Sequence, residues 1–526
     1  MNKRVTIRRL RSGVEGLDEV LGGGVPEFSF NLIVGGPGCG KTTLAHQIMF
    51  ANASPERPAL YVTVLGEPPL KMLRYQQQNT FFDERKLGAG HVQFLHLGHE
   101  LAESGIETVL ERIIEEVRKI GPKLVFVDSF RAISDRPGAT PSVLSDFIQR
   151  LSLQLTAWEV TSFLVGEYAD QNSENQAVFT IADGVVWLRQ SIERSSIVRR
   201  AQVLKIRGQA QIPGLHTYRI SDDGLRVYPR MASRAPEGVA ADREDRKSTG
   251  IEALDAMMGG GVPAGYTVMV VGPTGSGKSL LSTQFILEGI ERGEPGVIAV
   301  FEKRPEEYLQ TLPEGKKLGE LLEEGGLRMM YLRPLDLSVE ETMEHLRAQV
   351  IEIGAKRVTL DSISGFELAL APTYREDFRE SLYRMISALT RLGVTVMMTA
   401  EVIESNSELR LSPHNISFLT DCLILQRYVD VGGRLTKAIS VIKMRGCAHS
   451  DELRAYTIDA DGIQLGDALT RFGAVFDVAP VPKAGPGGRS ASKKKTSKKK
   501  TSKKETSKKK GRPSAKKADP SRRVRA

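Results

Sequence analysis

Short apolar segments alternate with longer amphipathic ones through most of the chain. In the first half, residues 59–64 and 92–97 are predicted strands, and residues 106–120 form a predicted amphipathic helix. Four apolar residues followed by Asp128 predict a buried strand that ends in a carboxylate. Because alternating strands and helices form mostly parallel sheets, the pattern predicts an α/β fold.

The whole pattern occurs twice. Residues 12–26 and 248–263 each contain a short predicted helix (17–21 and 254–258) followed by Gly-Gly-Gly-Val-Pro. Each half also contains a later strand that ends in glutamate, at Glu167 and at Glu401, and a closing β-rich segment, at 184–208 and at 423–446. A repeat of this length predicts two whole domains and not a solenoid.

Composition divides the chain further. We expect a first domain over residues 1–231, a polar linker over 232–247, a second domain over 248–476 and a lysine-rich tail over 477–526. The tail repeats Thr-Ser-Lys-Lys-Lys and has too few apolar residues to form a core, so we expect it to be disordered.

The net charge of +9 is distributed unevenly. Residues 483–526 carry +17, so the remainder of the chain carries −8. The tail is therefore either a nonspecific contact for DNA or another polyanion, or a solvated tail that keeps the protein soluble. The chain has three scattered cysteines, no apolar run long enough to span a membrane and no signal peptide, so we expect a cytoplasmic protein that does not enter membranes.

Two glycine-rich segments fit the Walker A pattern, each between a predicted strand and a predicted helix. Gly35, four residues and then Gly40-Lys41-Thr42 form the first, and Lys278-Ser279 ends the second, 237 positions later. Such a loop binds phosphate oxygens with its N–H groups and with the lysine, which predicts ATP as the ligand. The predicted ATP-binding residues are Gly35, Gly36, Pro37, Gly38, Cys39, Gly40, Lys41, Thr42, Thr43, Gly272, Pro273, Thr274, Gly275, Ser276, Gly277, Lys278, Ser279 and Leu280.

A metal site is predicted beside each loop. Asp128 and Asp361 end buried strands, where ligands of open α/β sheets bind, and are interpreted as Walker B residues that hold Mg²⁺. Thr42 and Ser279 supply the hydroxyl ligands of that ion. Glu167 and Glu401 either orient the attacking water or are only polar strand ends.

Two P-loop domains that each open with Gly-(Val/Ile)-Glu-x-Leu-Asp and close with Lys-(Ile/Met)-Arg-Gly resemble the KaiC family of RecA-type ATPases. The similarity covers about residues 10–470. It implies two tandem RecA-like domains and a double-ring homohexamer with ATP between subunits. It also implies ATP hydrolysis, serine/threonine autokinase and autophosphatase activity in the second ring, and a signalling or clock-like role.

The resemblance also implies residue roles. Lys205, Arg207, Lys443 and Arg445 match the Lys-x-Arg-Gly motif, whose basic side chains reach the γ-phosphate bound by the neighbouring subunit. Of the two adjacent glutamates that the family uses to activate the nucleophile, the second half keeps Glu302 and has Lys303 in place of the other. The first half has only the displaced Glu67.

The phosphorylation segment of the family corresponds to residues 415–421. Ser417 matches the phosphoacceptor serine, Phe418 stands at the threonine position, and Ser412 matches another hydroxyl position. The tail differs from the family's C-terminal tail, so the signalling partner is unknown. Two alternatives stay open: a nucleic-acid-binding RecA relative, and an ATP-dependent scaffold with negligible turnover.

Overall fold

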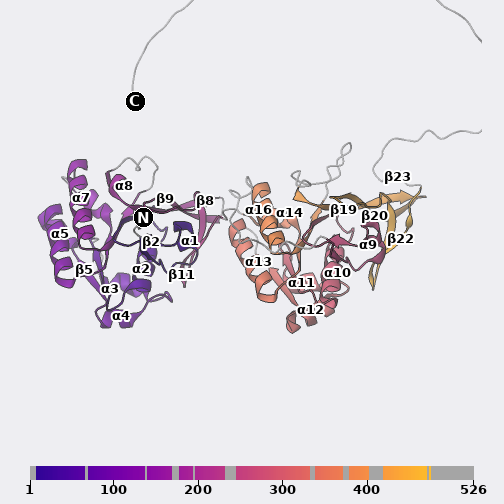
Figure 1. Cartoon of the computed structure of the whole chain (residues 1–526), viewed down its shortest axis with the longest axis horizontal. Coiled ribbons are helices and arrows are strands. Elements are labelled where there is room, and N and C mark those ends of the chain that lie inside the picture. The colour runs from indigo at the N-terminus through magenta and orange to yellow at the C-terminus, as the bar shows by residue number, and fades with distance from the viewer. Residues whose placement is uncertain are drawn as a thin grey trace, which may run out of the picture. The chain divides into compact units, whose positions relative to one another are not determined.

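The chain forms two α/β halves with a common order of elements, except that the described residues include α8 only in the first half and β23 only in the second (Figure 1). The computed structural model describes residues 7–64, 69–136, 139–168, 177–193, 196–230, 244–331, 338–370, 378–401, 419–470 and 473–474. We call residues 7–230 the first half and residues 244–474 the second half. Glu67, Ser412, Ser417, Phe418 and the lysine-rich tail lie outside the described residues.

The first half is built on a nine-stranded sheet in the order β11-β10-β9-β8-β3-β7-β6-β4-β5. Six of these strands run parallel, and the edge formed by β9, β10 and β11 is antiparallel. The strands are β3 (Phe30–Gly35), β4 (Ala59–Thr63), β5 (Val92–His96), β6 (Leu124–Asp128), β7 (Thr161–Glu167), β8 (Gly184–Glu193), β9 (Ser196–Ile206), β10 (His216–Ser221) and β11 (Gly224–Tyr228). A separate pair contains β1 (Arg9–Leu10) and β2 (Val25–Pro26).

Helices cover both faces of this sheet. They are α1 (Leu17–Leu21), α2 (Lys41–Asn52), α3 (Pro69–Gln76), α4 (Glu84–Gly88), α5 (Gly98–Ile120), α6 (Phe130–Ser134), α7 (Pro141–Ala157) and α8 (Ala177–Ile181). Alternate strand residues point to opposite faces: Leu60 packs in the core that includes α5 and α7, whereas Tyr61 packs in the core that includes α2. The helix predicted over 106–120 begins earlier, at Gly98, and has a kink at Gly105, whose φ is 86°.

The second half repeats this plan. Its sheet has the order β16-β15-β17-β18-β14-β19-β20-β21-β22, with β23 paired to β19, and six parallel strands. The strands are β14 (Thr267–Gly272), β15 (Gly296–Val300), β16 (Leu327–Tyr331), β17 (Arg357–Asp361), β18 (Thr395–Glu401), β19 (Cys422–Val431), β20 (Arg434–Met444), β21 (Arg454–Asp459), β22 (Gly462–Ala468) and β23 (Gly473–Ala474). The helices are α9 (Glu252–Met257), α10 (Lys278–Glu291), α11 (Pro305–Gln310), α12 (Gly315–Glu324), α13 (Val339–Ile353), α14 (Ile363–Ala369) and α16 (Phe378–Arg391). The predicted fold of two tandem RecA-like domains is therefore confirmed.

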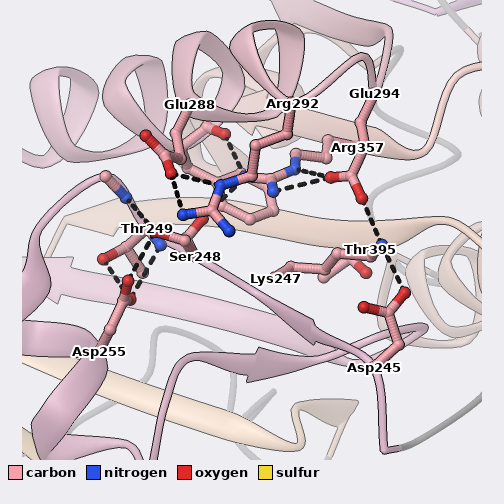
Figure 2. Close-up of polar contacts among 12 residues, drawn as sticks. Asp245, Lys247, Ser248, Thr249, Asp255, Glu288, Arg292, Glu294, Arg357 and Thr395 are labelled. Carbon is pink, nitrogen blue, oxygen red and sulfur yellow. Dashed lines mark hydrogen bonds and ion pairs between the residues drawn. The ribbon is translucent and has the colours of Figure 1, made fainter.

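A partly buried ionic network joins the beginning of the second half to its sheet (Figure 2). Arg357, the first residue of β17, is fully buried and donates to the Glu294 carboxylate at 2.8 Å and to the Ser248 backbone oxygen at 2.7 Å. Glu294 also pairs with Lys247. Burial opposes ionisation of Glu294, but its hydrogen bonds to Lys247 and Arg357 outweigh that effect and lower its pKa.

This network includes residues at the end of the expected linker, 232–247. Arg246–Lys247 forms β12, which pairs with β13 (Val262–Pro263), and the Lys247 side chain is buried. The last two residues of the expected linker thus pack within the second half. The corresponding position to Arg357 in the first half is Leu124, because each precedes its strand's aspartate by four residues. The network therefore belongs to the second half alone.

Candidate functional site

Each glycine-rich loop connects the strand at the centre of its sheet to a helix. The first loop connects β3 to α2, where Gly40 at the N-cap has a φ of 89°, and the second connects β14 to α10, where Gly277 has a φ of 97°. This left-handed conformation favours glycine. The N–H groups in the first turn of α2 and α10 lack intrahelical acceptors, so both helix ends are suited to bind phosphate.

The two predicted phosphate-binding lysines have the same geometry. Lys41 Nζ donates to the backbone oxygen of Gly36 at 2.7 Å, and Lys278 Nζ donates to that of Pro273 at 2.8 Å. Burial lowers the pKa of Lys278, although three nearby carboxylates oppose the shift. Each ammonium group thus lies along its own loop, where a phosphate oxygen can replace the carbonyl as its partner.

In the first half, the predicted metal ligands contact each other directly. The Thr42 hydroxyl, in the first turn of α2, donates to Asp128 Oδ2 at 2.8 Å, and Tyr61 donates to the same oxygen at 2.7 Å. Asp128 is 4% exposed. Burial raises its pKa, against the opposing effects of the two hydrogen bonds and of Lys41.

In the second half, Asp361 is held in a related way. It accepts hydrogen bonds from Tyr308 to Oδ2 at 2.9 Å and from Thr399 to Oδ1. Ser279 lies in the first turn of α10, at the position that Thr42 occupies in α2. Both aspartates end a central parallel strand beside the loop, as the sequence predicts.

This donor set fits Mg²⁺ that arrives with a nucleotide. Mg²⁺ typically uses one or two carboxylates together with substrate phosphates and water, and does not need a cage of protein ligands. Among the residues that the structure describes, no three His, Cys, Asp or Glu side chains are close enough to hold a metal ion. One carboxylate and one hydroxyl suit a nucleotide-bound Mg²⁺, and the lysine beside them suits the phosphates. Thr42, Asp128, Ser279 and Asp361 would hold it, and the ion would neutralise charge on the phosphates.

The predicted general base of the second half is exposed to solvent at the same edge of the sheet. Glu302 follows β15, and its Oε1 accepts a 2.7 Å hydrogen bond from Ser362, the residue after Asp361. A Cβ at Gly365 would lie 2.5 Å from Glu302 Cγ, so glycine leaves room for this side chain. Glu67, the corresponding prediction for the first half, lies outside the described residues.

The two strand-end glutamates differ from each other. Glu401 accepts a hydrogen bond from Thr274 in the second loop. Glu167 instead lies 3.4 Å from Arg131 of α6. Both lie at the loop end of their strands.

The four basic residues of the Lys-x-Arg-Gly motifs lie at the other end of the sheet. Lys205 donates to the Thr180 backbone oxygen at 2.9 Å, and Arg207 pairs with Asp183 at 3.0 Å. Lys443 and Arg445 repeat these contacts with Thr420 at 2.7 Å and Asp421 at 3.2 Å.

Their place follows from strand direction. Lys205 is at the end of β9, opposite Val185 near the start of β8, and β8 begins opposite Asn31 at the start of β3. The loop follows Gly35, the last residue of β3, so roughly 13 Å of strand separates the two sites.

Two tyrosines that the sequence analysis missed donate hydrogen bonds to backbone oxygens of the loops. Tyr218 in β10 donates to the backbone oxygen of Cys39 at 2.7 Å, and Tyr456 in β21 donates to that of Ser276. A signal was present, because Tyr-x-Ile occurs at this place in both halves. The Cys39 side chain is fully buried, which raises its pKa and disfavours the reactive thiolate.

Both halves of the chain match the same family of known proteins. A protein-family model described as "ATPase: KaiC" matches residues 10–232 and again residues 247–469. The chain is 28% identical to the circadian clock oscillator protein KaiC of Picosynechococcus sp. over 485 residues, which cover 90% of this chain and 92% of that protein. It is 28% identical to the protein of that name from Rippkaea orientalis, and 26% identical to circadian clock oscillator protein KaiC 1 of Synechocystis sp., with 92% of each relative covered.

The matched regions contain both loops, both aspartates and both Lys-x-Arg-Gly motifs described above. A family match over most of the chain, with the nucleotide-binding geometry present in each half, identifies the protein: it belongs to the KaiC family of ATPases.

Proposed function

We propose that this protein binds ATP with Mg²⁺ in each half and hydrolyses it, at least in the second half, as a ring of six subunits. The observation that carries the proposal is the duplicated geometry of the loop lysine, the first-turn hydroxyl and the buried aspartate. Glu302 then activates the attacking water in the second half, and Lys278 stabilises the charge on the phosphates.

The placement of the basic motif supports assembly through the nucleotide. Lys205 and Arg207 lie at the far end of the sheet from the loop of their own half, so they can reach a γ-phosphate only outside that half, and we assign it to a neighbouring subunit. The Arg207 side chain is 60% exposed and can leave Asp183 for a stronger anionic partner. Lys443 and Arg445 repeat the arrangement, so each ATP would lie between two subunits.

The test combines mass and turnover on the full-length chain. Native mass spectrometry in Mg-ATP should give a hexamer, and phosphate release should be absent from the Lys41→Ala/Lys278→Ala variant. A hexamer with no phosphate release from the unmodified protein would favour the scaffold alternative. A monomer that hydrolyses ATP at the full rate would refute the proposed contact between subunits.

We further propose serine autokinase activity in the second half, with Ser417 as acceptor. The support is positional, because residue 417 falls between β18 and β19, in the segment that corresponds to the family's phosphorylation site. Ser417 itself lies outside the described residues. Transfer requires an aligned hydroxyl, a base and charge neutralisation, and Glu302, Lys443 and Arg445 could provide the base and the charges.

The relatives' names concern circadian clocks, and we propose a related regulatory role for this chain, with the nucleotide or phosphorylation state as the signal to an unidentified partner protein. Nucleic-acid binding is the competing function. Because residues 1–482 carry −8, we expect DNA to bind only through the tail. DNA binding that is salt-dependent and survives deletion of residues 483–526 would favour the nucleic-acid-binding alternative instead.

A further inference from the structure

Each predicted Walker B aspartate accepts a hydrogen bond from a buried tyrosine. Tyr61 donates to Asp128 Oδ2 at 2.7 Å, and Tyr308 donates to Asp361 Oδ2 at 2.9 Å. Tyr61 is fully buried, and Tyr308 is 3% exposed. The same bond to the same carboxylate oxygen therefore occurs in both halves.

The two tyrosines do not occupy corresponding positions. Tyr61 is in β4, two residues before Thr63, which lies opposite Asp128. The residue two before Val300, which lies opposite Asp361, is Ile298. The position of Tyr61 thus holds no hydroxyl in the second half.

The converse also holds. Tyr308 is in α11, eight residues after Val300. The residue eight positions after Thr63 is Lys71. The duplicated halves thus differ at both positions, and each supplies the phenol from a different element. Because two different elements supply the same hydrogen bond to the aspartate, we infer that this bond is important for the function of the aspartate.

A residue of the P-loop helix supports each phenol. The residue five positions after the loop lysine is His46 in α2 and Thr283 in α10. The His46 ring lies 4.5 Å from the Tyr61 ring, centroid to centroid, and Thr283 Oγ1 lies 3.5 Å from the Tyr308 hydroxyl. Both phenols are thereby fixed between the sheet and the helix that carries the phosphate loop.

We propose that Tyr61 and Tyr308 are positioning residues that orient the aspartates for Mg²⁺, an inference that rests on the proposed ATPase function. A phenol donates a hydrogen bond without adding positive charge, so the carboxylate is held while keeping its full negative charge for the cation. An arginine or lysine at the same place would hold the aspartate but neutralise it. A second hydroxyl, from Thr42 in the first half and Thr399 in the second, completes the restraint.

The second half carries an additional link. Tyr308 lies six residues after Glu302, and α11 follows the segment that contains this predicted base. The segment that carries the base is therefore anchored to the aspartate through Tyr308. In the first half, the donor is instead in β4, a strand that pairs directly with the strand of Asp128.

The experiment uses full-length protein in which one site is silenced at a time. Tyr308→Phe is made together with Lys41→Ala, and Tyr61→Phe together with Lys278→Ala. Mn²⁺ binding in the presence of ATP is measured by electron paramagnetic resonance, and ATP binding in EDTA is measured with a fluorescent ATP analogue. We expect each phenylalanine to raise the Mn²⁺ concentration at half-saturation about tenfold, as loss of a residue that supports a metal ligand does, with unchanged ATP affinity in EDTA.

The matched control is Tyr266→Phe in the Lys41→Ala background. This change removes a buried phenol that donates to the Arg445 backbone oxygen at 2.9 Å, next to the start of β14 and away from the loop. It should leave the Mn²⁺ midpoint unchanged.

The possible outcomes separate the two proposals. Single-site proteins with intact tyrosines that bind neither ATP nor Mn²⁺ would contradict the proposed function. If they bind both, and the phenylalanine variants have the same midpoint, the tyrosines do not position the aspartates. If the phenylalanine variants have a lower melting temperature in EDTA but an unchanged Mn²⁺ midpoint, the two tyrosines have only a structural role. That result would also overturn the inference.

Discussion

The Ser362 hydroxyl donates a 2.7 Å hydrogen bond to Oε1 of Glu302. The two residues follow β17 and β15, which are neighbours in the sheet, and so they reach the same edge. The same hydroxyl accepts a 3.0 Å hydrogen bond from the Gly365 N–H at the N-terminus of α14. Ser362 therefore fixes the predicted base in relation to the predicted metal ligand, Asp361.

Loss of the base should reduce hydrolysis in the second half strongly. In a Lys41→Ala background, we expect Glu302→Gln to lower phosphate release by ~10²–10⁴-fold, the usual range for a general base, with ATP still bound. Ser362→Ala should have a smaller effect, because the base stays but loses its restraint. The neighbouring exposed carboxylate gives the control, Glu306→Gln, which should behave as the parent. Unchanged turnover in an assembled Glu302→Gln variant would contradict the assignment.

Action between subunits predicts complementation. The Arg207→Ala/Arg445→Ala variant should bind ATP but hydrolyse it ~10³–10⁵-fold more slowly, as enzymes do without an arginine finger. The Lys41→Ala/Lys278→Ala variant should fail to bind ATP. When the two variants are mixed, subunits with intact arginines lie beside subunits whose loops bind ATP. Phosphate release should then return to a measurable fraction of that of the unmodified protein. A mixture no more active than its separate components would exclude action between subunits.

Assembly should depend more on the first half than on the second. The resemblance to the family assigns assembly to the first ring, so we expect Lys41→Ala to weaken the hexamer more than Lys278→Ala does. Sedimentation velocity with and without ATP measures the difference. If both variants form stable hexamers without nucleotide, ATP does not hold the ring together.

His46 should make the stability of the first half depend on pH. Burial lowers its pKa to about 3 in the folded chain, against an opposing contribution from Gln76, so between about pH 6.5 and about pH 3 the unfolded chain binds the proton and the folded chain does not. The stabilisation is complete above about pH 6.5 and is lost on acidification by up to about 1.4 kcal/mol per pH unit. His46→Leu should remove this slope, whereas exposed His99→Leu should preserve it.

The measurement can be restricted to the first half. Both tryptophans of the chain, Trp158 and Trp187, are located there, so their fluorescence during urea unfolding follows that half alone. The free energy of unfolding is plotted against pH for the parent and for His46→Leu. Equal slopes between about pH 5 and about pH 7.5 would show that His46 does not cause the pH dependence of stability.

Phosphorylation gives a direct test of Ser417. Incubation with γ-labelled ATP should label the parent and spare Ser417→Ala, because the labelled phosphoryl group needs that hydroxyl as acceptor. Ser412→Ala, at the second candidate position, is the matched control and should be labelled like the parent. Loss of label in Ser412→Ala would identify Ser412 as the acceptor instead. Equal labelling of the parent and Ser417→Ala would refute the assignment, and no label on either would leave an ATPase without kinase activity.

The sequence by itself determined the elements whose signals are local. The loops at Lys41 and Lys278 are contiguous, and their glycines and lysine specify a turn and a ligand without help from distant residues. Asp128 and Asp361 are recognisable because each ends a short apolar run, and the duplication is visible as repeated letters. The predicted helix at 17–21 has the bounds that the structure gives it, because three glycines end it locally.

Only the tertiary structure decided which side chains meet. Tyr61 reaches Asp128 because β4 is paired with β6. Tyr308 reaches Asp361 because the fold brings α11 to Thr283 of α10 and to the end of β17, and local periodicity encodes neither arrangement. The same holds for Ser362 with Glu302, for Tyr218 beneath Cys39, and for Lys247, which appears as a linker residue in the sequence but is buried against Glu294. Contacts of this kind depend on strand order and on the face to which each side chain points, and both are fixed only when the whole sheet forms.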